Sequence, residues 1–144
     1  MKILNQQIFE NKEAAALPGL MESGGLPALV SGLSGIHRVN LAAALYENLE
    51  LPMFVVCPDD SAAESFTRDL ESMLGRPVNT LYSRDFTFYP SLAASREAEQ
   101  KRLYVLNALR CGESPVTVAT VSALMQRAIP PQTLGKATFT LKDG

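Results

Sequence analysis

Short apolar segments alternate with amphipathic stretches along the chain. The apolar segments predict five β-strands, at residues 26–32, 51–57, 77–83, 114–120 and 137–142. The second and fourth are dense in β-branched and aromatic residues, which is typical of central strands covered on both faces. The last alternates apolar and polar residues, as a half-exposed or edge strand does.

The stretches between these segments carry apolar residues at helical spacing. They predict helices over residues 39–49, 61–74, 95–110 and about 121–127. Ser61 and Glu64 form a capping box at the start of the second helix, and Gly75 is a natural stop at its end. This alternation predicts an α/β fold, a parallel sheet of about five strands flanked by helices.

The pattern divides the chain at about residue 25. Residues 1–25 predict one or two helices broken near Pro18 and Gly19, and residues 26–144 form the α/β domain. A length of 144 residues suits a single core. The C-terminal sequence KATFTLKDG predicts a strand that runs directly into a turn, so we expect a fragment of a longer protein.

Composition limits the partners more than the fold. The formal net charge is −2, from 13 basic and 15 acidic side chains, so we expect contact with DNA to be weak or indirect. No apolar run approaches the ~20 residues that cross a bilayer, and the N-terminus does not resemble a signal peptide. We therefore expect a cytoplasmic protein with no membrane contact.

Residues with catalytic or metal-binding chemistry are sparse. Cys57 and Cys111 lie far apart without CxxC spacing, which is typical of two reduced thiols. His37 is the one histidine, so the sequence predicts neither a zinc site nor a Ser–His–Asp or Cys–His arrangement. We predict no catalytic residues and no metal.

The sequence SGLSGIHRVN follows the first predicted strand, where a phosphate-binding loop would lie. In a Walker A loop, GxxxxGK followed by Ser or Thr, glycine N–H groups wrap the phosphates, the lysine neutralises charge and the hydroxyl binds Mg²⁺. The degenerate loop here consists of Gly32, Ser34, Gly35, His37 and Arg38. His37 or Arg38 replaces the lysine, and Val39 replaces the hydroxyl. We expect no bound cofactor and interpret the loop as a structural turn; the alternatives are weak anion binding and ATP hydrolysis.

Basic residues follow the predicted helix over residues 95–110. Arg96, Lys101 and Arg102 could contact DNA or a neighbouring domain, but Glu97 and Glu99 interleave with them. Such interleaving is more typical of a solvated face with local ion pairs. We expect Arg102 to anchor the helix or a neighbouring domain.

Two further groups have alternative interpretations. Asp59 and Asp60 follow a strand, where functional carboxylates often lie, but they also precede a helix, whose N-terminus acidic residues stabilise. The sequence RDFTFYP, residues 84–90, could stack on bases, but alternating Phe86 and Phe88 favour packing of a loop. We favour the structural interpretation of both groups.

Four longer segments carry a family resemblance. They are PALVSGLSGIHRVNLAAAL, MFVVCPDDSAAESFTRDLESML, NTLYSRDFTFYPSLAASREAEQKRLYVLNAL and VTVATVSALMQRAIPP. In this order they resemble the first domain of the UvrB-homology module of the bacterial transcription-repair coupling factors, the Mfd family. The resemblance extends over about residues 26–144 and implies a RecA-like fold, related to the P-loop NTPases, with a degenerate Walker A loop.

Two departures from UvrB, the wider relative, bear on function. The lost lysine and hydroxyl imply that this domain is not an ATPase, unlike UvrB. Between Tyr89 and Arg102 the chain is too short for the tyrosine-rich hairpin with which UvrB probes DNA. Damage sensing by this domain is therefore not expected.

The resemblance implies a non-catalytic scaffold domain in transcription-coupled nucleotide excision repair. Its parent would be an ATP-dependent DNA translocase that displaces stalled RNA polymerase, with ATP and Mg²⁺ in motor domains outside this chain. The domain would contact the following domains of the same protein, scaffold recruitment of UvrA and help autoinhibition. Two alternatives are a nucleotide hydrolase with an atypical loop and a nucleic-acid-binding helicase lobe.

Overall fold

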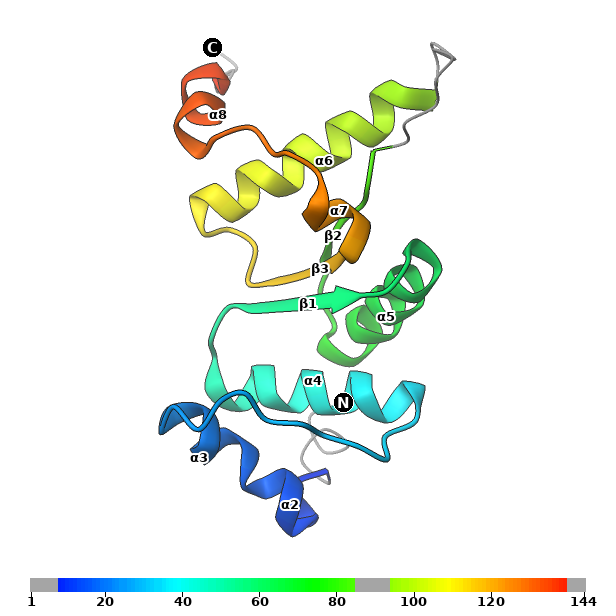
Figure 1. The fold of residues 1–144 in the computed structure, drawn as a ribbon, viewed down its shortest axis with the longest axis vertical. Helices are drawn as coiled ribbons and strands as arrows, with labels where there is room; N and C mark the ends of the chain where they lie inside the picture. The colour runs from blue at the N-terminus through cyan, green and yellow to red at the C-terminus, as the bar shows by residue number, and fades with distance from the viewer. Residues whose placement is uncertain (1–7, 85–93, 140–144) are drawn as a thin grey trace.

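The computed structural model describes residues 8–84 and 94–139. They form an α/β fold around a parallel three-stranded sheet with helices on both faces (Figure 1). The sheet has the order β1–β3–β2, where β1 is Met53–Cys57, β2 is Asn79–Leu81 and β3 is Val116–Thr120. Three of the five predicted strands, at 51–57, 77–83 and 114–120, are thereby confirmed.

Both faces of the central strand are buried, because its residues alternate between two apolar cores. On one face, α4 (Gly35–Leu49) and α5 (Asp60–Leu74) pack on the sheet, and Val118 belongs to that core. On the other face, α6 (Ala94–Cys111) and α7 (Val121–Met125) cover Ala119. This explains why all five residues of β3 are buried, as the dense apolar pattern predicted.

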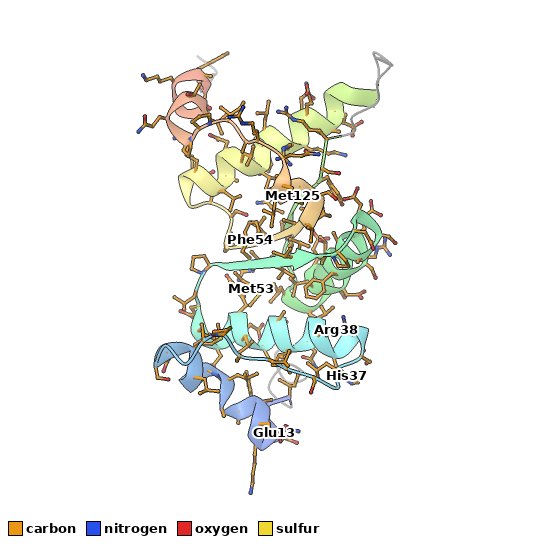
Figure 2. All side chains as sticks on the ribbon, viewed as in Figure 1. Glu13, His37, Arg38, Met53, Phe54 and Met125 are labelled. Atoms are coloured by element: carbon orange, nitrogen blue, oxygen red, sulfur yellow. The ribbon has the colours of Figure 1, made fainter. Side chains whose placement is uncertain are left out.

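The outer strand β1 is covered less completely. Met53 lies on the side of β1 that faces α4, whereas Phe54 lies on the side that faces α7 (Figure 2). Phe54, Val56 and Met125 remain exposed there, Met125 by 84%. An apolar surface thus extends from β1 onto α7.

The predicted strand at 26–32 is wrong, since the structure has no strand in this segment. Pro27 lacks the N–H group that a central strand donates to its neighbour. Leu29 is 95% exposed, so the apolar residues of this segment do not form a strand face on the core. The segment reaches α4 without entering the sheet (Figure 1).

The predicted strand at 137–142 also differs from the structure. A short helix, α8 (Pro131–Ala137), ends at the first residue of that segment, Thr138 and Phe139 are in no strand, and residues 140–142 lie outside the described part. Pro131 stands in the first turn of α8, where its missing N–H has no helical partner to lose. The described residues therefore hold a sheet of three strands, not five.

Helix boundaries follow the sequence closely but differ in the caps. Helix α4 begins at Gly35 rather than at residue 39, and α5 ends at Gly75 with a left-handed φ of 67°. The N-cap of α5 is Asp59, whose carboxylate accepts from the Ala62 N–H at 2.8 Å, in place of the predicted Ser61. For Asp59 the capping interpretation is confirmed.

The N-terminal region contains short helices, but Pro18 and Gly19, where a break was predicted, lie inside one of them. The helices are η1 (Ile8–Glu10), α2 (Lys12–Ala15) and α3 (Leu17–Glu22), while residues 1–7 lie outside the described part. The break between α2 and α3 falls at Ala16, and Pro18 lies in the first turn of α3. None of the helices that the structure describes is both long and apolar enough to cross a bilayer.

Candidate functional site

The degenerate loop leads into the start of α4. Gly32 has a left-handed φ of 79°, and extended Ser34 is the N-cap residue of the helix. The Ser34 side chain caps no helical N–H group; its Oγ is hydrogen-bonded to His37 Nδ1 at 2.7 Å. The hydroxyl and the imidazole thus satisfy each other.

The two residues at the lysine and hydroxyl positions have different roles in the structure. Arg38 is exposed, and its Nε donates to the carbonyl oxygen of Leu33 at 3.2 Å, within the loop. Val39, in the first turns of α4, is buried in the core that α4 and α5 form with the sheet. A hydroxyl at position 39 would therefore face apolar side chains instead of a metal ion.

The loop lacks the strand that a Walker A loop follows. Because residues 26–32 are in no strand, the loop does not extend from the carboxyl end of a sheet strand. The N-terminal N–H groups of α4 still form a positive helix end, where Gly35 and His37 are exposed. Figure 2 shows His37 at this end of the helix. Weak anion binding at this loop stays an untested alternative to the predicted structural turn.

A second group of functional side chains lies where the parallel strands end. Arg102 of α6 is only 4% exposed, and its guanidinium donates to two carbonyl oxygens: that of Tyr82, at 2.7 Å, and that of Ala123, at 3.1 Å. Tyr82 directly follows β2, and Ala123 lies in α7. Arg102 therefore clamps α6 to the end of β2 and to α7.

Gln126 strengthens the same junction. Its side-chain oxygen accepts from the Arg84 N–H at 2.7 Å, and its amide nitrogen donates to the Arg84 carbonyl oxygen at 3.1 Å. The side chain of Gln126 thereby makes the same two hydrogen bonds to the backbone of Arg84, after β2, that a neighbouring strand would make. Burial lowers the pKa of Arg102, and the positive charge of Arg84 lowers it further.

Lys101 has the opposite environment from its neighbour in sequence. Its side chain is 65% exposed and pairs with Glu97, one turn earlier, at 2.8 Å. This ion pair lowers the pKa of Glu97 and raises that of Lys101. Arg96 lies in α6, but its side chain is outside the described part. Since Arg102 is buried, it adds no charge to an exposed basic strip. Contact of Arg96 and Lys101 with DNA or a neighbouring domain stays a prediction.

A pocket of about 330 Å³ opens beside this junction. Asp60 and Glu64 of α5 line it from one side, Lys101 and Arg102 of α6 from the other, with Tyr82 between them. Burial raises the pKa of Tyr82, and the negative charge of Glu64 raises it further. The pocket lies at the carboxyl ends of parallel strands, where α/β proteins bind ligands.

The remaining candidate residues add little to these two sites. Cys57 is buried and Cys111 exposed, and both are free thiols. Residues 85–90 of the aromatic cluster lie outside the described part. Within residues 8–84 and 94–139, no three His, Cys, Asp or Glu side chains gather into a group that could hold a metal ion.

The chain is 31% identical over 140 residues to the transcription-repair-coupling factor of Bacillus subtilis. This chain resembles a segment of a transcription-repair-coupling factor. The match covers 93% of the chain and 11% of the Bacillus protein, so the chain spans about a ninth of that relative's length. It confirms the resemblance seen in the four sequence segments. No protein-family model and no solved structure matches the chain.

Sequence reasoning found one residue of the strand-end junction and missed the others. Arg102 was expected to anchor the helix or a neighbouring domain, but Gln126 and Thr120 were not singled out. Thr120 is fully buried and caps α7 by accepting from the Ala123 N–H at 3.1 Å. The available sequence signal was Thr120 at the end of β3, followed by Ala123 and Gln126, within the segment VTVATVSALMQRAIPP that carried the resemblance.

Proposed function

We propose that this chain is a non-catalytic scaffold domain of a transcription-repair coupling factor, with a RecA-like ancestry and a phosphate loop that no longer binds nucleotide. In the cytoplasm, its parent would move along DNA with ATP and Mg²⁺ in other domains and displace stalled RNA polymerase. This domain would support recruitment of UvrA and an autoinhibited state. The match to the Bacillus factor carries this proposal.

The contacts within the loop support the proposal that this domain is not catalytic. Val39 belongs to the core, and Ser34 is hydrogen-bonded to His37. Arg38, which with His37 is a candidate replacement for the Walker lysine, donates to a carbonyl of its own loop. Binding a triphosphate would require these contacts to break without supplying a ligand for Mg²⁺.

Mg²⁺-ATP should leave the melting temperature of the chain unchanged. A ligand at 100 times its Kd would stabilise the fold by about 2.7 kcal/mol and raise the Tm by about 5 °C or more. Differential scanning fluorimetry of the unchanged chain, of Arg38→Ala and of the matched Lys136→Ala variant measures this. A rise that Arg38→Ala removes and Lys136→Ala keeps would contradict a retired site.

The apolar surface on β1 and α7 supports the proposal that this domain is a scaffold. Phe54, Val56 and Met125 would lie against water in the isolated chain. Contiguous apolar surface of this kind is typical of sites where another protein domain packs. We propose that a following domain of the same protein covers this surface in the autoinhibited state.

In the full-length protein, replacing both Phe54 and Met125 with serine should raise the ATPase rate and the affinity for UvrA. Coupling between domains of 1–3 kcal/mol corresponds to changes of about fivefold or more. Steady-state ATPase assays and UvrA pull-down titrations measure the two effects. The matched control is Leu29→Ser, which removes an exposed leucine elsewhere. Unchanged ATPase and UvrA binding in the double variant would refute the autoinhibitory contact.

A further inference from the structure

A groove runs along β2 between α5 and α6. Its longer part has a volume of about 540 Å³ and is lined by Thr67 and Glu71 of α5, Asn79 and Thr80 of β2, and Tyr104 of α6. It is continuous with the pocket at the strand ends, because Tyr82 and Lys101 line both. We call the combined space the α5–α6 groove.

The floor of the groove is an unpaired strand edge. In the described sheet β2 pairs with β3 on one side, and no described strand lies on its other side. Helix α5 contacts β2 and the residue before it: Glu71 accepts from the Val78 N–H at 2.9 Å, and the hydroxyls of Thr67 and Thr80 are hydrogen-bonded at 2.8 Å. A free edge between two helices can accept an extended peptide as an additional strand.

The charges at the end of the groove favour a cation. Lys101 is paired with Glu97, and Arg102 is engaged by two backbone carbonyls. No basic side chain in the described part forms an ion pair with Asp60 or Glu64, which lie one turn apart on α5. Burial raises the pKa of Tyr82 most, and the negative charges of Glu64 and Asp60 raise it further.

Apolar contact is available in the middle of the groove. The ring of Tyr104 is 68% exposed and borders it beside the half-buried Tyr82. Aromatic rings of this kind offer area to the apolar side chains of an extended peptide and to the stems of lysine or arginine. The groove therefore combines a strand edge, aromatic walls and an acidic end.

We propose that the α5–α6 groove binds an extended basic segment of a partner protein, which adds to β2 as a strand and places a lysine or arginine against Asp60 and Glu64. This inference is independent of the proposed scaffold role. The carboxylates oppose nucleic acid, whose phosphates they repel.

Binding of short labelled peptides tests the proposal. The probe alternates valine and lysine, and two analogues carry serine or glutamate in place of lysine. Fluorescence polarisation at low salt should show the lysine peptide binding most tightly, the serine peptide more weakly and the glutamate peptide not at all. Added salt should weaken binding of the lysine peptide. Equal binding of the three peptides, or no binding of the lysine peptide, would overturn the proposal.

Matched variants locate the binding site. Asp60→Asn with Glu64→Gln should weaken binding of the lysine peptide roughly three- to tenfold, since exposed ion pairs contribute up to about 1 kcal/mol each. Glu13→Gln with Glu22→Gln makes the same charge change on α2 and α3 and should leave affinity unchanged. Equal losses in both double variants would show attraction to net charge only, and would refute the groove. If the first pair impairs folding in circular dichroism, Glu64→Gln alone is compared with Glu13→Gln.

Backbone methylation of the peptide tests the strand addition separately. N-methyl groups on alternate residues remove the donors on one edge of the peptide, and shifting them by one residue removes those on the other edge. One of the two methylated peptides should lose binding at least tenfold while the other keeps it. Equal affinity of both for the chain would refute pairing with β2.

Discussion

Replacing Arg102 with methionine should lower the free energy of unfolding by about 2–3 kcal/mol. The guanidinium donates to the carbonyl oxygens of Tyr82 and Ala123, and hydrogen bonds from a charged donor contribute about 1.5–3 kcal/mol each. Methionine fills similar space without donors and leaves both carbonyls buried and unpaired. Relief of the buried charge offsets part of the loss, so the expected total is less than the sum of two bonds.

Urea denaturation followed by circular dichroism measures this effect. Arg102→Lys should be intermediate, because a single ammonium group cannot reproduce the planar fork that reaches two elements at once. The matched control is Lys101→Met, one residue earlier, whose side chain is exposed and should leave the midpoint close to that of the unchanged chain. Equal midpoints for Arg102→Met and Lys101→Met would contradict the clamp.

The comparison between these neighbours shows where sequence reasoning ends. Lys101 and Arg102 are adjacent basic residues on one predicted helix, and both entered the same predicted strip. Only the packing of α6 on the sheet decides that one faces water and the other faces the end of β2. The helix was predictable from spacing, but the separate roles depend on contacts from residues 20 or more positions away.

The sheet illustrates the same limit. Strand β3 was predictable as a central strand because a continuous run of β-branched residues is typical of a strand between two covering layers. The similar run in β1 predicted the strand correctly but its position wrongly, since β1 is the outer strand of the described sheet and Phe54 and Val56 are exposed on one face. The segment 26–32 has a similar apolar content, but a run of apolar residues does not specify whether a neighbouring strand exists to pair with it. Pro27 was an available signal against a paired strand, because it lacks the N–H group that such a strand donates.

Proline also explains the missed helix. Pro130 and Pro131 follow the helix predicted at about 121–127, and the next predicted element was the strand at 137–142. In the structure Pro131 opens α8, and Leu134 is buried. The same residue type ends one element or begins the next, depending on whether its missing N–H would have had a partner. Tertiary packing decides whether such a hydrogen-bond partner would be present.

Replacing Leu70 with alanine should lower the free energy of unfolding by about 3 kcal/mol, within a range of about 2–5 kcal/mol for buried leucines. Leu70 lies on the buried face of α5 and is fully buried in the core that contains Val39, Val78 and Val118. Alanine would leave a cavity between both helices of this layer and the sheet, and the well-packed β3 cannot move to fill it.

Urea denaturation at constant temperature checks this value, with Leu29→Ala as the control because Leu29 is 95% exposed. An unchanged m-value would show that the two variants still unfold from a compact native state. The test also bears on the loop, since Leu70 shares its core with Val39, the residue that replaces the Walker hydroxyl. A loss below about 1 kcal/mol would mean that this core is loosely packed, and the argument that position 39 is unable to carry a metal-binding hydroxyl would fail with it.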